Sequence, residues 1–285
     1  MSLKETKKTG KRIKFGIVLS ISILALFVGV AVFADYLAPH NPTKINLAKN
    51  LTPPFFQGGT KVYLLGTDQL GRDILSRLIY GARVSLIVAA IGVLLSGGIG
   101  GALGILAGYR GGNTDTIISR AADVMLGFPT ILLALVLAIV LGASLFNIAL
   151  VVVLIYWARY ARQSRAETLK VREMDYVTLA RTSGCSDFTI ILRHIVPNVL
   201  NSLIVLATFN AGTVITLESS LSFLGAGIPP PTPSWGSMCA DGRGILVEAW
   251  WVSLMPGVAI TLVVLSGNLF GDWLRDKLDP KLRDL

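Results

Sequence analysis

The sequence predicts an all-α membrane protein with six transmembrane helices and both termini in the cytoplasm. Hydrophobic residues make up 53% of the 285-residue chain, charged residues only 15%, and the mean hydropathy is +0.65. Soluble domains carry about a quarter charged residues. The charges also lie between long charge-free runs, and a helix needs roughly 20 such residues to cross a bilayer.

Five charge-free runs supply the six helices, at residues 15–34, 84–109, 124–158, 195–217 and 249–271. The third run is too long for one crossing. Gly142, Ser144 and Asn147 near its centre predict a tight turn between two antiparallel helices, the first beginning near Ile117. The first run, with its basic flank, also resembles a signal peptide, but its apolar stretch exceeds the usual length of about 7 to 15 residues. An uncleaved anchor is favoured, and cleavage would leave five spans.

The distribution of Lys and Arg predicts the orientation. With the N-terminus inside, the cytoplasmic pieces hold 19 of the 26 basic residues, as the positive-inside rule requires. The net charge of +9 is therefore mainly a topology signal, and no basic patch with interleaved aromatic residues predicts nucleic-acid binding. The segments in order are a cytoplasmic tail (1–14), a first transmembrane helix (15–34), an external loop (35–82), a core of five transmembrane helices (83–273) and a cytoplasmic tail (274–285). The core includes a cytoplasmic loop (159–194) and an external loop (218–250).

Residues 66–86 of the first external loop predict an amphipathic helix along the membrane interface. Leu70, Ile74 and Leu78 recur at helical spacing, and Thr67 or Asp68 can cap the helix start. The helix serves either as a packing collar around the bundle or as a substrate contact.

The second span contains the glycine-rich stretch GGIGGALGILAG, residues 97–108. Several of its glycines are four apart, which lets another helix approach closely. Packing within the chain is the favoured interpretation, and a dimer face or a moving contact is the alternative.

The usual signatures of catalysis are missing. Cys185 and Cys239 fall on opposite sides of the membrane, as do His40 and His194, so no metal-ligand cluster or intrachain disulfide is predicted. No phosphate loop or hydrolase motif occurs. We therefore predict no catalytic, cofactor-binding or metal-binding residues and expect that the chain is not an enzyme. The membrane runs also carry no charged relay, which disfavours a secondary carrier working alone.

The cytoplasmic loop 159–194 predicts two short helices that meet at Gly184. Glycine ends helices readily, and Ser186 or Asp187 can cap the second helix. Apolar residues recur every third position upstream, at Val171, Met174, Val177 and Ala180. With this apolar stripe exposed beyond the membrane, the loop is expected to form a knob suited to a groove on another protein.

Several motifs together carry a family resemblance. Ala180, Gly184 and Pro197 have the spacing of a loop motif written E-A-A, three residues, G, nine residues, I-x-L-P, although Thr178, Leu179, His194 and Val196 depart from it. The stretches LGTDQLGRD (65–73), ESSLSFLG (218–225), PSWG (233–236) and LRDKLDP (274–280), together with the pattern of Arg120, Asp123 and Phe128-Pro129, agree in order. The chain resembles the permease subunits of bacterial ABC importers of the dipeptide and oligopeptide class.

The resemblance implies a multi-pass protein of the bacterial inner membrane that binds no cofactor itself. Its partners would be membrane lipid, a second homologous permease, two ATPase subunits that bind ATP and Mg²⁺, an extracytoplasmic substrate-binding protein and a peptide substrate. Relatives carrying nickel chelates or glutathione leave the cargo open. The residues expected to couple to the ATPases are Thr178, Leu179, Ala180, Gly184, Ser186, Asp187 and Pro197.

The second external loop supplies candidates for the pathway or its mouth. Its four prolines between residues 229 and 233 predict a stiff, non-helical turn. Glu218 either faces the pathway or has a structural role at the helix end. The candidate mouth residues are Glu218, Ser219, Phe223 and Trp235.

Overall fold

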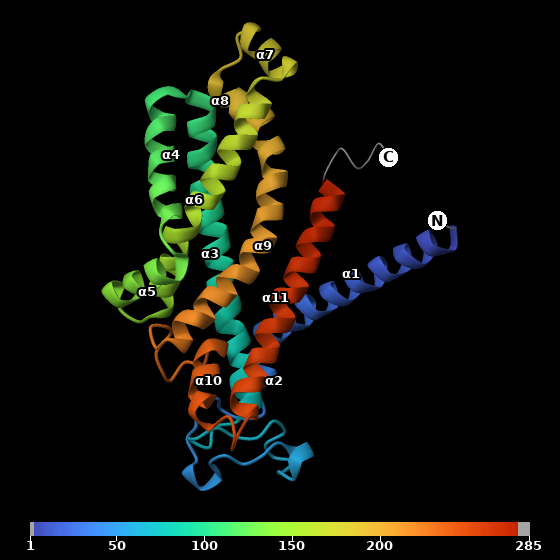
Figure 1. Ribbon diagram of the computed structural model, residues 1–285, viewed down its shortest axis with the longest axis vertical. Coiled ribbons are helices and arrows are strands. Elements are labelled where there is room, and N and C mark those ends of the chain that lie inside the picture. The colour runs from blue at the N-terminus through green and yellow to red at the C-terminus, as the bar shows by residue number, and fades with distance from the viewer. Residues whose placement is uncertain (1–2, 279–285) are drawn as a thin grey trace.

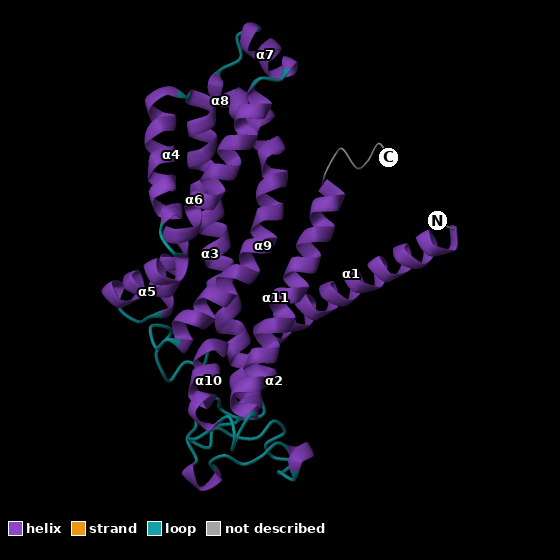
Figure 2. Cartoon of the chain, in the orientation of Figure 1, coloured by secondary structure: helices purple, strands orange, loops and turns teal. Residues whose placement is uncertain are grey.

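The computed structural model describes residues 3–278, with side chains from Gly16 onward, and within this range it contains helices and loops but no strand (Figure 2). The prediction of an all-helical chain is confirmed. The predicted tails lie partly outside the described residues. The α-helices are α1 (Leu3–Val32), α2 (Ala34–Leu37), α3 (Ile74–Arg110), α4 (Gly112–Gly127), α5 (Thr130–Leu141), α6 (Leu145–Arg172), α7 (Asp175–Thr182), α8 (Asp187–Ile190), α9 (Val196–Phe223), α10 (Trp235–Gly242) and α11 (Trp251–Leu278). Short helical turns are η1 (Leu47–Lys49), η2 (Phe55–Gln57), η3 (Ile191–Ile195) and η4 (Arg243–Ile245).

Four helical segments are long and apolar enough to cross a membrane, and a bent pair of helices makes a fifth. The four are residues 74–110, 145–172, 187–223 and 251–278, and the pair is α4 with α5. In α1 the apolar segment with described side chains, Gly16–Val32, is shorter. Length and composition thus support four or five spans, and the sixth stays a prediction.

The long helices form one elongated bundle (Figure 1). Helix α3 packs against α6 and α9, and α11 packs against α9 and α1. Helices α7 and α8 lie at the upper end in Figure 1, whereas α10 and the loop between α2 and α3 lie at the lower end. Helix α11 ends in the upper half of the view, and α1 projects obliquely from the lower half of the bundle to near mid-height.

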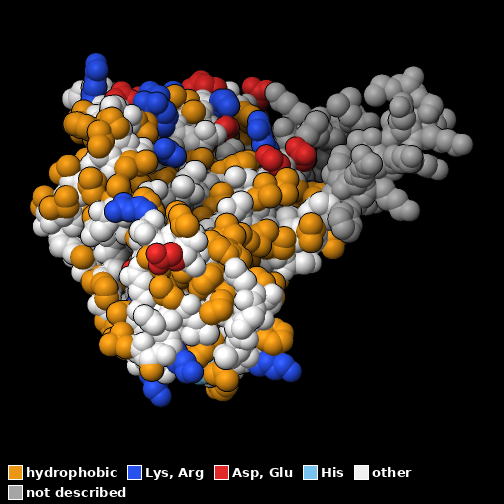
Figure 3. Space-filling view, turned by 60° about the horizontal axis from the view of Figure 1, so that its bottom comes forward, with side chains coloured by type: hydrophobic (Ala, Val, Ile, Leu, Met, Phe, Trp, Pro, Cys, Tyr) orange, Lys and Arg blue, Asp and Glu red, His pale blue; other side chains and the backbone are white. Residues whose placement is uncertain are grey.

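The main hydrophobic core lies between α1, α3, α5, α6, α9 and α11, with residues such as Val88, Val152 and Leu221 fully buried. On the face shown in Figure 3, hydrophobic side chains cover much of the surface, and most of the Lys and Arg side chains lie toward the top and bottom of the view. A surface of this kind is suited to a lipid environment.

The interfacial helix expected over residues 66–86 is not a separate element. Helix α3 begins at Ile74, where the Asp73 side chain accepts a hydrogen bond from the Ser76 N–H at 2.9 Å, and it continues without a break to Arg110. Residues 67–73 form a turn instead, because Asp68 Oδ1 accepts hydrogen bonds from the backbone N–H groups of Leu70 and Arg72. Such side-chain bonds compete with helix formation.

The helix expected to begin near Ile117 is broken in the structure. Helices α4 and α5 are bent by 95° relative to one another, and Phe128 and Pro129 separate them. Proline disfavours a helical conformation of the preceding residue, and Phe128 is accordingly extended, with φ −85° and ψ 143°. The predicted turn after this segment is confirmed, since Ser144 caps α6 by accepting a hydrogen bond from the Asn147 N–H.

Helices α8 and α9 are joined by η3, a π-helical turn, so that residues 187–223 form one continuous helical segment. Pro197 lies in the first turn of α9, as expected. Proline has no backbone N–H and so leaves one carbonyl of the preceding turn without its helical hydrogen bond. The wider π-helical turn η3 lies at this point of the helix. The proline-rich stretch 229–233 is non-helical, as predicted.

The glycines of α3 confirm the prediction of packing within the chain. A Cβ atom placed on Gly100 would lie 2.2 Å from the Trp157 carbonyl oxygen, and one on Gly104 would lie 2.2 Å from that of Ala161. Both carbonyls belong to α6. The close approach of α3 and α6 therefore depends on the absence of side chains here.

Candidate functional site

The loop between α6 and α8 forms a compact knob, which we define as residues 174–190. Helix α7 ends in a Schellman motif, in which the Gly184 N–H donates to the Arg181 carbonyl and the Cys185 N–H donates to that of Ala180, both at 3.1 Å. Gly184 has φ +81°, the left-handed conformation that favours glycine. Ser186 then caps α8 by accepting a hydrogen bond from the Thr189 N–H. The predicted helix–glycine–helix arrangement is confirmed.

The apolar stripe of α7 faces inward, contrary to the expectation of an exposed stripe. Val171 and Val177 are buried and pack with Ile190, Ile195 and other residues in a small core at the base of the knob. Of the expected stripe, only Met174 is exposed, and Ala180 is half-buried. The stripe is used to fold the knob, so another set of residues must form its outer surface.

Polar contacts also fix the knob to the end of α3. The Tyr109 hydroxyl donates a hydrogen bond to Asp187 Oδ1 at 2.6 Å. The Arg181 guanidinium carbon lies 5.7 Å from the centre of the Tyr109 ring, which is a cation–π distance. The knob is therefore attached to α3 as well as to the helices before and after it in the chain.

The outer surface of the knob is apolar in part. Leu179 is 65% exposed and Phe188 is 70% exposed, and Tyr176 is also exposed. Among the predicted coupling residues, Thr178, Leu179, Gly184, Ser186 and Asp187 are exposed on the knob, whereas Ala180 is half-buried and Pro197 lies outside it on α9. Large apolar side chains exposed together beyond the spans are typical of a protein-binding surface.

The candidate mouth residues at the other end are mostly buried. Glu218 is fully buried, and it accepts hydrogen bonds from the Ser85 hydroxyl at 3.1 Å and from the Ser222 hydroxyl at 2.9 Å. Trp235 is also fully buried, and its indole N–H donates to the Leu78 carbonyl. These contacts favour the structural alternative for Glu218, and neither side chain reaches the surface of the chain in this conformation.

Of the other two candidates, Ser219 is buried and Phe223 is 38% exposed. Phe223 is therefore the one candidate of the four that the structure places at the surface. It lies in the last turn of α9.

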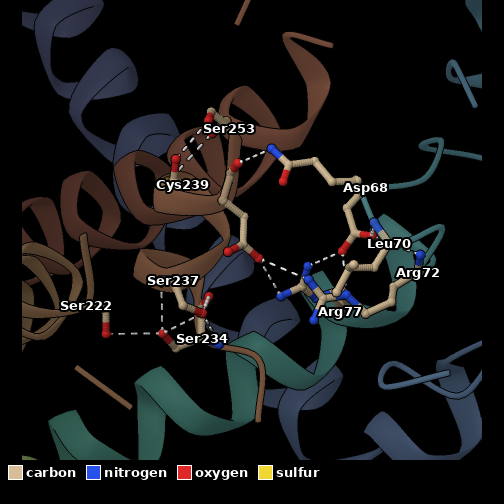
Figure 4. A network of polar contacts seen from close by, with 11 residues as sticks. Asp68, Leu70, Arg72, Arg77, Ser222, Ser234, Ser237, Cys239 and Ser253 are labelled. Carbon is tan, nitrogen blue, oxygen red and sulfur yellow. Dashed lines mark hydrogen bonds and ion pairs between the residues drawn. The ribbon is translucent and has the colours of Figure 1, made fainter. Parts of the chain in front are cut away.

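An ion network, which sequence reasoning missed, holds the external loop to the bundle (Figure 4). Asp68 and Arg77 are almost completely buried and pair with each other, and the Arg72 Nε donates to Asp68 Oδ2 at 2.7 Å. Both arginines also pair with Asp241 of α10, at 3.0 and 3.1 Å. The i,i+4 spacing of Asp68 and Arg72 was a usable signal, but nothing in the sequence pointed to Asp241.

Within the described residues, no group of His, Cys, Asp and Glu side chains is arranged to hold a metal ion. The two features that carry the functional argument are the knob and residues 210–223 of α9, which contain Glu218, Ser219 and Phe223.

Comparison with protein families decides the identity. The family described as binding-protein-dependent transport system inner membrane component matches residues 100–284, and the N-terminal TM domain of oligopeptide transport permease C matches residues 16–54. The chain belongs to this family of inner-membrane transport components. It is accordingly a multi-pass protein of the inner membrane.

Individual relatives agree with this assignment. The chain is 45% identical over 269 residues to the dipeptide transport system permease protein DppC of Escherichia coli, which covers 94% of this chain and 90% of that protein. It is 41% identical to the DppC of Haemophilus influenzae, over 94% of this chain and 91% of that protein. Identity to the probable D,D-dipeptide transport system permease protein DdpC of Escherichia coli is 39%, over 93% and 87%.

Two solved structures share the fold of this permease. One is the MetNI methionine ABC transporter in inward-facing conformations, with a TM-score of 0.59 and 17% identity, covering 72% of this chain and 98% of that one. The other is an amino acid ABC transporter with histidines, with a TM-score of 0.55 and 11% identity, covering 71% and 94%.

Proposed function

We propose that this chain is a permease subunit of an ATP-driven importer of dipeptides or short oligopeptides. It would form the inner-membrane pathway together with a second, homologous permease, and take peptide from an extracytoplasmic binding protein. Two ATPase subunits would bind and hydrolyse ATP with Mg²⁺ on the cytoplasmic side. The observation that carries the coupling role is the knob, a rigidly attached element that exposes apolar side chains at one end of the bundle.

The attachment of the knob suits it to transmit a force. It is bonded to α3 through Tyr109, it follows α6 in the chain, and it leads directly into the continuous helical segment 187–223. A displacement of the knob would therefore move three of the long helices together. Rigid-body tilting of this kind is a common mode of switching between two conformations.

We further propose six spans with both termini in the cytoplasm. The spans would be α1, α3, the bent pair α4 and α5, α6, the segment 187–223 and α11. The connection between α3 and α4 would then face the ATPases, as would the knob. The loop before α3 would face the binding protein. That loop exposes Phe56, Val62 and other apolar side chains.

The coupling role can be tested with surface changes that leave the core of the knob intact. Leu179→Glu and Phe188→Glu each place a charge on the exposed apolar surface, and a carboxylate there would be desolvated on docking. We expect that the ATPase subunits no longer co-purify with these variants and that ATP-dependent dipeptide uptake in proteoliposomes is lost.

Asn113→Glu is the matched control, because Asn113 is an exposed residue in the first turn of α4, at the same end of the bundle. A carboxylate is favourable near a helix N-terminus. The control should co-purify with the ATPases and transport normally. Normal ATPase binding by both knob variants would contradict the proposal, and uptake by the purified chain without any ATPase would favour a stand-alone carrier.

A further inference from the structure

The outer half of α9 exposes one narrow face, and hydroxyl groups line it. Thr213 and Thr216 are exposed and Ser220 is half-exposed, at helical spacings of three and four residues that place them on the same side. Phe223 continues this line at the end of the helix. The residues around them from 210 to 222 are buried, apart from the half-exposed Ala211. We call Thr213, Thr216 and Ser220 the hydroxyl face.

The hydroxyl face differs from a face that suits lipid. Helix α5 exposes only aliphatic side chains after Thr130, with Val136 58% and Ile139 67% exposed. Each hydroxyl of the hydroxyl face donates to a carbonyl of its own helix, as the Thr216 hydroxyl does to the Gly212 carbonyl at 3.0 Å. The donor is thereby used, and the oxygen lone pairs are left as acceptors on the exposed side.

Arg243 of η4 lies at the outer end of the hydroxyl face. Its guanidinium carbon is 5.3 Å from the centre of the Phe223 ring, and the residue is exposed. The other arginines of the predicted external loops, Arg72 and Arg77, both pair with carboxylates, as does Arg83 next to them. Arg243 has no such partner within residues 16–278. A guanidinium held on an aromatic ring with its donors free is suited to bind a carboxylate from outside the chain.

We propose that the hydroxyl face lines the translocation pathway and that Arg243 binds the C-terminal carboxylate of a peptide at the outer entrance. The inference rests on the proposed function and names where its substrate would bind. The guanidinium matches a terminal carboxylate, and the hydroxyl oxygens can accept hydrogen bonds from peptide N–H groups. Both features are common to all peptides, so this surface would conduct them without selecting side chains.

The first test measures water access along the hydroxyl face. Thr216→Cys and Ser220→Cys are made in a Cys185→Ser background, because Cys185 is exposed. The complete transporter is trapped with Mg-ATP and vanadate and treated with a charged methanethiosulfonate reagent. We expect both cysteines to react, and Val136→Cys on the aliphatic face of α5 to remain unmodified. Equal lack of reaction at Thr216→Cys and Val136→Cys would overturn the pathway assignment.

The second test isolates the carboxylate. Dialanine should protect Thr216→Cys from the reagent. Dialanine amide, which lacks the terminal carboxylate, should give the same protection only at about tenfold higher concentration, as expected for the loss of one charge-assisted contact. In Arg243→Ala the two peptides should protect alike, whereas Arg243→Lys should retain part of the difference. Protection that does not distinguish the peptides in the unchanged chain, or that still distinguishes them in Arg243→Ala, would overturn the carboxylate site.

Failure of this inference can be told apart from failure of the proposed function. If ATPase subunits co-purify and uptake proceeds but Thr216→Cys does not react, only the pathway assignment fails. If no ATPase subunit is recovered with the chain, the proposed function itself fails. If Arg243→Ala loses stimulation by the binding protein while the two peptides still differ, Arg243 belongs to a docking surface and the carboxylate site is wrong.

Discussion

The contact between α3 and α6 gives the sharpest stability prediction, because two glycines of one helix have opposite surroundings. A Cβ atom on Gly104 would lie 2.0 Å from the Ser164 hydroxyl oxygen and 2.2 Å from the Ala161 carbonyl oxygen. A Cβ atom on Gly98 would have nothing within 4 Å. Gly104→Ala should therefore destabilise the protein, and Gly98→Ala should not.

The size of the effect follows from the distances. Real Cβ contacts essentially never fall below 3.0 Å, so the helices must separate by roughly 1 Å, and overpacking of this kind costs about 1–3 kcal/mol in free energy of unfolding. For a domain of this size, 1 kcal/mol lowers the melting temperature by about 2–4 °C. Gly98→Ala should be neutral or stabilising by up to about 1 kcal/mol, because alanine favours helix more than glycine does.

The assay is thermal unfolding of the purified chain in detergent, followed by size-exclusion of the remaining folded protein. Gly104→Ala with Ser164→Gly is the informative double variant. It removes the hydroxyl clash but leaves the Ala161 backbone carbonyl in place, so stability should be restored only in part. Equal melting temperatures for Gly104→Ala and Gly98→Ala would refute the argument that the helix contact depends on glycine.

Four further predictions address the ion network, the knob, the Cys239 thiol and the topology. Asp68→Asn removes one of the two carboxylates that pair with the buried Arg77, and we expect a loss of at most about 3–5 kcal/mol in free energy of unfolding, measured by the same thermal assay. Gly184→Ala strains a left-handed position by about 1–2 kcal/mol and should weaken ATPase co-purification, whereas Gly184→Asn should weaken it less. Burial raises the pKa of the Cys239 thiol to about 11, so its thiolate is scarce at neutral pH and its alkylation should be slow until the pH approaches that value. The exposed Cys185 should react with an impermeant maleimide in inside-out vesicles but not in intact cells, and the reverse would contradict the proposed orientation.

Local signals predicted the parts of the structure that depend on neighbouring residues. Gly184 and Ser186 mark the knob because helix ends are determined by the residues at those ends. The turn before α6 was predictable for the same reason. The bend between α4 and α5 was also encoded locally, in Phe128 and Pro129, but the continuous apolar run concealed it. In a membrane segment, hydrophobicity alone does not distinguish a straight helix from a broken one.

The direction in which side chains face depends on distant residues and was harder to predict. The spacing of Val177 indicated an apolar face on α7, but whether that face was exposed depended on the core formed with Ile190 and Ile195. Glu218 lies near the end of a span, where a glutamate is equally compatible with a role in the pathway and with a structural role. Only the positions of Ser85 and Ser222 around its carboxylate distinguish them.

The knob leads directly into the helical segment that carries the hydroxyl face, and this connection gives the two proposals a common mechanical basis. Residues 187–223 span 37 helical residues, or about 55 Å at 1.5 Å per residue. If this segment tilts as a unit by roughly 10°, its two ends move by about 10 Å relative to one another. Helices α3 and α6 would be carried along, since Gly104 holds them in close contact and Tyr109 bonds α3 to the knob. Under the two proposals, a displacement of about 10 Å at the knob would thus be enough to open or close the entrance beside Arg243.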